Sequence, residues 1–452
     1  MKAGFGKNDI TPRVGVEMFG FGPYRNRKSI GIRDILEART AVLECGGKTV
    51  VLVTLDLGGI YIPEVIAKIR SRIREKHPEL RDQDIMISTS HTHSGPAASP
   101  TNNGWGVTDP PWLALLPGKI AVSAEQAFAN LEEVRVSQAE VPCRHMGLNR
   151  VYDRDAPPLE DVLREDWEPA KPELTDTVCR VIRFDSAAGR LLGFMAYFGC
   201  HPVVCCASNR YLHGDWPGVA MHTLMREFPG SVGMFLQGAE GDVNSGCVHK
   251  GEQESLLALD VFAARFSNAV RNGLNQAQEL KIVSLHAVSQ IFPFSANKLF
   301  TREKLLEIRA QQEAILDSPD AREDDYTCQM AAVYLQGIDR CLENLDREGF
   351  FIPAELHIIR LGPLQFMGAP FEIMQAIKND IVSASAAPYP MVMSLTNGVY
   401  GYAPDNDSLH KMTKSNYAAF MTPLIFGHLP FADVHNEMVR GMIELEQKIP
   451  QG

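Results

Sequence analysis

Two histidines lie one residue apart in the segment ISTSHTHSGP, residues 87–96, where an apolar run ends. On an extended backbone, residues two apart point to the same side, so the sequence predicts that His91 and His93 face one cavity. Neutral imidazole nitrogens and carboxylate oxygens are ligands of catalytic zinc, which keeps one position open for water. A pair of hydrogen-bonded loop histidines is the alternative interpretation. The neighbouring hydroxyl groups are expected to bond to the ring N–H groups: Thr89, Ser90, Thr92 and Ser94.

Three other segments carry candidate side chains for such a site. His201 ends a predicted strand in FGCHPVV, where it suits a third nitrogen ligand, a base or a satisfied core histidine. Glu372 in GAPFEIMQ follows a predicted strand and opens a predicted helix, which suits a ligand carboxylate or a partner of the helix dipole. Asp215 precedes Pro217 at a predicted helix start, where an N-cap is the favoured interpretation.

The loop QGAEGDVNSG, residues 237–246, combines glycines with polar side chains directly after an apolar strand. Glycines allow backbone N–H groups to approach a substrate oxyanion, so the loop is a candidate substrate site. A tight surface turn is the competing interpretation. The polar side chains that could orient water or bind substrate are Glu240, Asp242, Asn244 and Ser245.

The elements that must position these residues start with a predicted strand–helix–strand unit. A β-branched strand over 48–59 is followed by a helix over 62–80, with Pro63 at its start, and by a second strand over 84–90. Such a unit is right-handed and places both strands in one parallel sheet, with their ends on the same edge. Open α/β sheets bind ligands at that edge, so Asp56 and His91 are expected to lie near neighbouring strand ends.

The rest of the chain alternates between strands and helices and contains no internal repeat or clear linker. A hairpin is predicted over 176–202, a strand at 232–237 and late strands at 354–362, 364–368 and 391–398, with a helix beginning near 369. Charged helical patterns at about 252–277, 302–316 and 325–346 predict a helical insertion or outer layer. We therefore expect an α/β fold with a mixed, partly parallel sheet core and helices outside, in one large catalytic domain spanning 1–452.

Composition excludes several classes of partner. With 452 residues, a net charge of −11 and a pI near 5.7, the chain lacks the basic footprint that nucleic acid or an anionic membrane requires. No apolar run approaches the roughly 20 residues needed to cross a bilayer, and no apolar signal segment follows Met1, so a cytoplasmic protein without a stable membrane anchor is expected. Nine cysteines without CxxC spacing predict reduced, buried thiols. The oligomeric state is left open.

Several motifs resemble those of the neutral/alkaline, non-lysosomal ceramidase family and occur in that family's order. The most specific is HTHSGP, residues 91–96. The others are DITP (9–12), GLNRV (147–151), CHP (200–202), EGDVNSG (240–246), GAPFE (368–372) and TNGVYGY (396–402). The resemblance therefore covers nearly the whole chain.

The resemblance implies a role for each matching residue. A catalytic zinc ion would be held by His91, His201, Glu372 and Tyr402, with Tyr400 as the alternative to the last. The same resemblance implies that His93 and Arg150 line the substrate pocket and that Asp242 supports the glycine-rich loop.

The chain also departs from the family pattern. The family's ceramidases read Gly-Asp-Val-Ser-Pro in the loop, with a catalytic role for the serine, whereas this chain has Asn244 at that position and Ser245 one residue later. An asparagine cannot act as the nucleophile. The C-terminal β-sandwich domain and the secretion signal of those ceramidases have no counterpart in this sequence, so the substrate need not be ceramide.

The sequence thus favours a zinc-dependent hydrolase of a carboxamide bond that uses metal-activated water, because such a mechanism requires no serine. Its substrate would be a small-molecule or lipid-like amide. In this hypothesis His93 or Asp242 transfers the proton, and Arg150 and Asn244 bind the substrate or the developing oxyanion. Two alternatives stay open: the same site acting on another acyl or ester bond in a soluble substrate, and a non-catalytic binding protein on a ceramidase scaffold.

Overall fold

Two β-sheets packed face to face form the centre of the protein. The structure, a computed structural model, describes residues 1–99, 105–153, 157–164, 166–410 and 416–450. The large sheet has the spatial order β11 (Val232–Gln237), β9 (Leu191–Phe198), β8 (Val178–Ser186), β6 (Glu132–Pro142), β1 (Lys2–Asp9), β3 (Glu37–Cys45), β4 (Lys48–Leu55) and β5 (Ile85–Thr89), with β13 (Gln278–Leu280) beside β6. The second sheet has the order β14 (Leu285–Ser295), β15 (Phe351–Leu361), β16 (Leu364–Gly368) and β18 (Tyr389–Met393).

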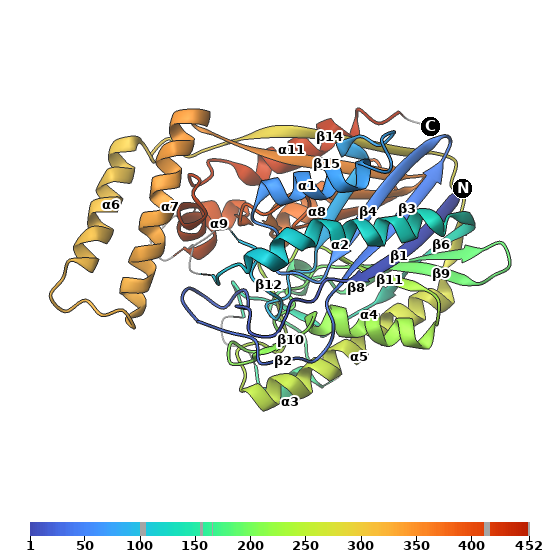
Figure 1. Ribbon diagram of the computed structural model, residues 1–452, viewed down its shortest axis with the longest axis horizontal. Coiled ribbons are helices and arrows are strands. Elements are labelled where there is room, and N and C mark those ends of the chain that lie inside the picture. Colours follow the sequence, from blue (N-terminus) through green and yellow to red (C-terminus); the bar gives the residue numbers. More distant parts are fainter. Residues whose placement is uncertain (100–104, 154–156, 165, 411–415, 451–452) are drawn as a thin grey trace.

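Helices cover the outer face of each sheet, which gives four layers in the order α, β, β, α (Figure 1). Over the large sheet lie α1 (Pro63–Arg74), α2 (Pro110–Ala129), α4 (Asp215–Glu227) and α5 (Glu252–Gln276). The second sheet is covered by α7 (Tyr326–Glu348), α8 (Gln375–Ala384) and α11 (Val434–Glu446), with α6 (Arg302–Leu316) packed against α7 at one end of the molecule. The predicted mixed α/β fold is confirmed.

The alternation of side chains along the central strands explains this layering. In β4, Val50 and Leu52 belong to the core between the two sheets, whereas Val51 and Val53 belong to the core under α1 and α2. Successive strand residues point to opposite faces, so a strand that is apolar at every position is buried on both. The run of apolar residues in β4 therefore requires covering layers on both sides.

Most predicted elements are present. The strand–helix–strand unit consists of β4, α1 and β5, the two strands are parallel, and Pro63 is the first helical residue. The helix ends at Arg74, earlier than expected, and the predicted hairpin is formed by β8 and β9. The helical patterns over 252–346 correspond to α5, α6 and α7.

Helix α2 has no counterpart among the sequence predictions. It starts with two prolines and contains Pro117, which breaks the pattern by which helices are recognised. Its N-terminus is defined instead by Asp109, whose carboxylate accepts a hydrogen bond from the backbone N–H of Trp112.

The nine cysteines are free and buried, as predicted. Among the described residues no helix combines the length and the apolar character that a bilayer crossing requires.

The large sheet curls so that its two ends approach each other. Strands β5 and β11 stand at opposite ends of the strand order, yet they lie in contact. The buried side chain of Gln237, at the end of β11, donates a hydrogen bond to the carbonyl of Ser90 just after β5, with 2.7 Å between Nε2 and the oxygen. Loops that leave β5, β9 and β11 therefore converge at one edge of the sheet.

Close backbone contact fixes α2 on β1, and it depends on glycine. A Cβ atom at Gly4 would lie 2.0 Å from the carbonyl oxygen of Ala127. We expect Gly4→Ala to lower the free energy of unfolding by about 1–3 kcal/mol through overpacking, measured as a lower urea midpoint. Gly118, exposed within α2 with no atom near its virtual Cβ, is the matched control, and Gly118→Ala should raise the stability by about 0.5–1 kcal/mol. Equal effects of the two substitutions would contradict this packing.

Candidate metal centre

Three side chains from distant parts of the sequence meet beyond the edge of the large sheet. His91 follows β5, His201 follows β9, and Glu372 lies on the short strand β17 (Glu372–Ile373). One carboxylate oxygen of Glu372, Oε2, lies 3.5 Å from Nε2 of His91 and 3.2 Å from Nε2 of His201. All three side chains are almost completely buried, with at most 3% of each residue exposed.

Backbone carbonyl groups fix the orientation of both imidazole rings. Nδ1 of His91 bonds to the carbonyl oxygen of Gly58, and Nδ1 of His201 bonds to that of Glu240 at 2.7 Å. A carbonyl oxygen can only accept, so each ring carries a proton on Nδ1 and turns its Nε2 towards Glu372. The expected partners of the rings, the hydroxyl groups around His91, do not fill this role.

The three facing atoms are therefore all electron-pair donors. Burial lowers the pKa of His201 to about 4, which keeps that ring neutral near pH 7. Burial by itself would raise the pKa of Glu372, but positive charge at His91 and His201 lowers it well below its usual value, so the group stays a carboxylate where a positive charge faces it. Its Oε2 is buried without a hydrogen bond. Two nitrogen lone pairs and an unsatisfied anionic oxygen in one buried place fit a divalent cation such as Zn²⁺.

His93 joins this group, although not for the reason that the sequence suggests. His91 has φ of +70° in a loop, so the two histidines are not on an extended strand. Their Nε2 atoms nevertheless lie 3.4 Å apart, and the ligand atoms of His91, His93 and His201 all fall within 4.8 Å of one another. Burial, followed by the neighbouring histidines, lowers the pKa of His93 well below its usual value. His93 is therefore neutral and available either to a metal or to a proton.

Tyr402 enters the site from a strand paired with that of Glu372. Strand β19 (Tyr402–Ala403) runs parallel to β17, with Tyr402 directly opposite Glu372 in the register. The guanidinium of Arg150 lies 5.0 Å from the centre of the Tyr402 ring. Tyr400, the alternative ligand, packs against Phe371 and lines a different hollow. The predicted position of Glu372 at a helix start is wrong, because α8 begins three residues later, at Gln375.

The glycine-rich loop does not offer its glycine N–H groups to a substrate, contrary to expectation. All three are bonded to backbone carbonyl oxygens: Gly238 to Phe198, Gly241 to Ile373 and Gly246 to Met146. The glycine at position 241 serves close packing instead, since a Cβ atom there would lie 2.5 Å from the carbonyl oxygen of Glu372. The loop is thereby pressed against the strand that carries the carboxylate ligand.

Asp242 holds this loop in place. One carboxylate oxygen accepts a hydrogen bond from the backbone N–H of Gln375 at 2.9 Å, and the other accepts one from Nδ2 of Asn149 at 2.7 Å. Burial raises the pKa of Asp242 to about 6. Both oxygens are thus engaged inside the protein, so the structure places Asp242 beside the site rather than in its cavity.

Asn244 and Ser245 point in different directions from the short strand β12 (Val243–Ser245), which pairs with β7 (Gly147–Asn149). Asn244 lines the cavity, whereas the buried hydroxyl of Ser245 donates to the carbonyl of His201 at 2.5 Å. The displaced serine therefore does not take the place of the family's catalytic serine.

A cavity of about 300 Å³ lies next to the histidines. Its polar lining includes His93, His201, Arg150, Asn244 and Tyr402, which the sequence analysis selected. The cavity lining also includes residues that were not predicted from the sequence: Phe21, Arg25, Trp105, His249 and Tyr417. No motif marks these residues, because they come from loops whose approach to the site is set by the tertiary structure.

Two acids selected in the sequence lie elsewhere. Asp56 pairs with the buried Arg39 at 2.8 Å, and Asp215 accepts hydrogen bonds from the backbone N–H groups of Val204, Cys205 and Trp216. Asp215 is the first residue of α4 rather than its cap. It also lies near His213 and Cys205, where both ring nitrogens of His213 already lie within hydrogen-bond distance of other groups, Nδ2 of Asn209 and the backbone N–H of Asp215.

Comparison with known proteins gives a match to one sequence family and structural matches that include two ceramidases. The family described as neutral/alkaline non-lysosomal ceramidase, N-terminal, matches residues 1–255. A neutral ceramidase from Pseudomonas aeruginosa is similar in structure, with a TM-score of 0.73 and 19% identity over 100% of this chain and 75% of that chain. A ceramidase complexed with C2 gives a TM-score of 0.72 and 20% identity over 99% of this chain and 76% of that chain. At these identities the structural likeness shows the fold.

The arrangement of donor atoms predicts one tightly bound divalent metal ion per chain. His201→Ala should reduce the metal content of the purified protein by at least about tenfold, because it removes a ligand that lies between the other donors. Plasma emission spectrometry measures the metal. His286→Ala, on β14, is the control and should leave the content unchanged. Undiminished metal in a His91→Ala/His201→Ala double variant would overturn the assignment.

The position of His93 depends on Gly20. Gly20 has φ of +95°, and a Cβ atom there would lie 2.5 Å from Nδ1 of His93. We expect Gly20→Ala to displace the ring, so that the His93 proton signals shift in the NMR spectrum. Gly46→Ala, at another positive φ with no atom near its virtual Cβ, controls for backbone strain alone. Unshifted His93 signals in Gly20→Ala would contradict this contact.

Proposed function

The chain belongs to the neutral/alkaline non-lysosomal ceramidase family, and on that premise we propose that it is a zinc-dependent hydrolase that cleaves a carboxamide bond. Membership in this family implies a hydrolase acting on amide bonds. The convergence of two imidazole Nε2 atoms and a carboxylate oxygen without a hydrogen bond is the observation that supports zinc dependence.

His91, His201 and Glu372 would hold the metal, and Tyr402 would complete the ligand set from the paired strand. When bound, zinc supplies Lewis-acid polarisation of the acyl oxygen and lowers the pKa of water towards about 7. The carbonyl groups of Gly58 and Glu240 keep both histidines in the tautomer that this requires.

His93 is the residue best placed to move a proton. Its ring is partly buried, with a lowered pKa that leaves it neutral near pH 7, it lines the cavity, and its Nδ1 has no hydrogen-bond partner among the described residues. It can therefore take a proton from attacking water and return it to the departing amine nitrogen. Asp242 is the weaker choice for this role, because both of its oxygens already accept hydrogen bonds.

Arg150 and Asn244 would orient the substrate. Both line the cavity, and Arg150 is anchored by its side-chain bond to the carbonyl of Gly241 and its backbone bond to Asp242. Donors fixed in this way can stabilise the oxygen on which negative charge develops, without reorganising during the reaction. The proposal needs no serine nucleophile, which agrees with the engagement of Ser245 by His201.

Hydrolysis of a short N-acyl amide should depend on both the metal and the histidines. Chelation should abolish turnover, added Zn²⁺ should restore it, and His91→Ala/His201→Ala should lower kcat/KM by at least about 10³-fold, because the cost of losing metal catalysis is several kcal/mol. Release of the amine measures the rate, and His286→Ala is the control. Full turnover by the chelated protein would overturn the proposal.

A matched ester tests the alternative that the same site cleaves another acyl bond. Turnover of the ester without turnover of the amide of the same acyl group would identify an esterase. A protein that holds zinc and turns over neither compound would favour the non-catalytic alternative.

A further inference from the structure

We propose that the substrate of this site carries an anionic group, a carboxylate or a phosphate, beside a short acyl chain. This inference rests on the proposed amide hydrolysis and names its substrate class. It is carried by a small cavity whose surrounding arginines have no carboxylate partner.

Three arginines lie on or directly behind the wall of the cavity. Arg25 and Arg150 line it, and the guanidinium of Arg27 lies 4.8 Å from the centre of the ring of Phe21, another lining residue. In the described part of the chain none of the three arginines forms an ion pair with a carboxylate, although the chain carries a net charge of −11. No aspartate or glutamate is among the lining residues that the structure describes.

The hydrogen bonds of these arginines end on uncharged groups, which are carbonyl oxygens and, for Arg150, also the phenol of Tyr402. Arg27 is 5% exposed and donates to Phe19, His93 and Asn209, while Arg150 donates to Gly241. Carbonyl groups satisfy N–H donors but do not neutralise the charge, so a buried cation of this kind is costly without a counter-ion. Burial lowers the pKa of Arg27 to about 10, which still leaves it charged.

Glu372 does not supply the missing charge. It attracts Arg150 electrostatically, but its carboxylate faces the Nε2 atoms of His91 and His201 and belongs to the proposed metal centre. A bound divalent cation would add further positive charge at this wall. The cavity is therefore electropositive within an acidic protein, which favours an anionic ligand.

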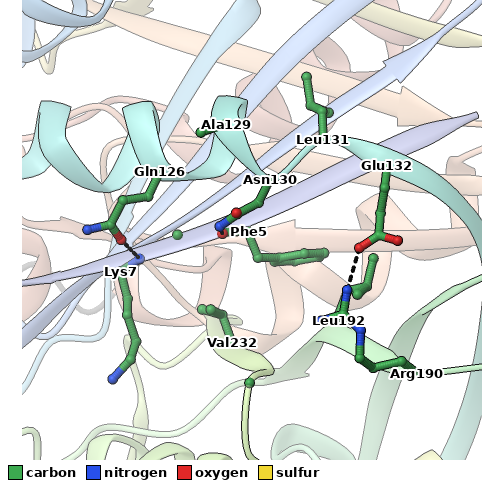
Figure 2. Close-up of a pocket in the computed structure, with 12 residues that line it drawn as sticks. Phe5, Lys7, Gln126, Ala129, Asn130, Leu131, Glu132, Arg190, Leu192 and Val232 are labelled. Atoms are coloured by element: carbon green, nitrogen blue, oxygen red, sulfur yellow. Dashed lines mark hydrogen bonds and ion pairs between the residues drawn. The ribbon is translucent and has the colours of Figure 1, made fainter.

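At a second hollow, the cationic side chains are paired with carboxylates. It has a volume of about 460 Å³ and lies beside β1, where Arg190 pairs with Glu132 at 2.6 Å (Figure 2). Lys7, on the same wall, pairs with Glu37 at 2.6 Å. The cations at this larger hollow are neutralised within the protein, unlike the arginines at the cavity beside the histidines.

Arg25 is the side chain best suited to recognise the anionic group. It is exposed, so it lies on the open side of the cavity, and only its Nε has a hydrogen bond among the described residues, to the carbonyl of Phe21. Its terminal amino groups therefore remain available for bidentate binding of a carboxylate or phosphate.

The size of the cavity limits the acyl chain. A volume of about 300 Å³ is at the low end of ligand pockets. The apolar wall formed by Phe21, Trp105, Val203 and Val248 suits a short acyl group. In the reaction, water adds to the acyl carbon, the C–N bond breaks and the nitrogen takes a proton, giving a short carboxylic acid and an amine that keeps the anionic group.

Three small N-acetyl compounds test the charge preference: N-acetylglycine, N-acetylethanolamine phosphate and neutral N-acetylethanolamine. Zinc-loaded protein should hydrolyse the better anionic compound with kcat/KM about 10- to 100-fold above the neutral one, the range expected of one charge-assisted contact. Comparison of the two anions identifies carboxylate or phosphate. N-acetylsphingosine tests a bulky neutral substrate and should be cleaved less efficiently than either anion.

Variants of Arg25 test whether this residue causes the preference for anionic over neutral substrates. Arg25→Gln should reduce the anion-to-neutral ratio of kcat/KM towards one, and Arg25→Lys should keep part of it. The matched control is Arg210→Gln, because Arg210 is also exposed and also bonds through Nε to a backbone carbonyl, that of Lys28, but lies outside the lining. Arg210→Gln should leave the ratio unchanged.

Direct binding separates this inference from the proposed hydrolysis. Titration calorimetry with both anionic compounds, on metal-free and zinc-loaded protein, should show binding that weakens about 10- to 100-fold in Arg25→Gln. Binding that depends on Arg25 without any turnover would support the proposed anion site and contradict the proposed hydrolase activity. Turnover that favours the neutral compounds, or anion binding that is equal in the wild type and Arg25→Gln, would overturn the anionic substrate.

Discussion

The candidate site depends on two backbone carbonyl groups that fix the protonation of two histidines. Because Gly58 and Glu240 accept from Nδ1, both rings direct Nε2 towards Glu372. The pKa of His201 is lowered to about 4, so this ring has no proton on Nε2 near pH 7, and burial removes the water that could separate the three facing atoms. Without a cation these atoms repel one another, so the same geometry that suits a metal would cost stability if nothing were bound.

The surrounding fold supplies rigid supports for this arrangement. The curl of the large sheet brings the end of β11 to the end of β5, and the bond from Gln237 to Ser90 holds these ends together. Gly241 lets the loop after β11 press against β17, and Asp242 connects that loop to the start of α8. The ligands thus lie on short loops, but each loop is fixed to a strand or helix, which is the arrangement that a precise metal site needs.

The glycine-rich loop, residues 237–246, departs from the family pattern at Asn244 and Ser245 but still supports a proposed metal ligand. Ser245 bonds to the carbonyl of His201, so it stabilises a proposed ligand and leaves the cavity to Asn244. Beside Asn244 the wall carries arginines whose charges are not matched by carboxylates in the described residues. The departure from the family motif at Asn244 therefore lies at the wall of the cavity, whereas the histidines and the glutamate are retained.

The sequence by itself determined the mixed α/β class, because alternating and continuous apolar runs such as that of β4 specify strands and their buried faces. It also identified the side chains that meet at the centre, since His91, His201 and Glu372 stand out by type and by position after strands. It did not give the tautomers, the use of glycine N–H groups within the loop or the positions of Gly20 and Arg25. Only the tertiary structure decided these, because β5 and β11 become neighbours through the curl of the sheet, and contacts between segments so distant in sequence leave no local pattern.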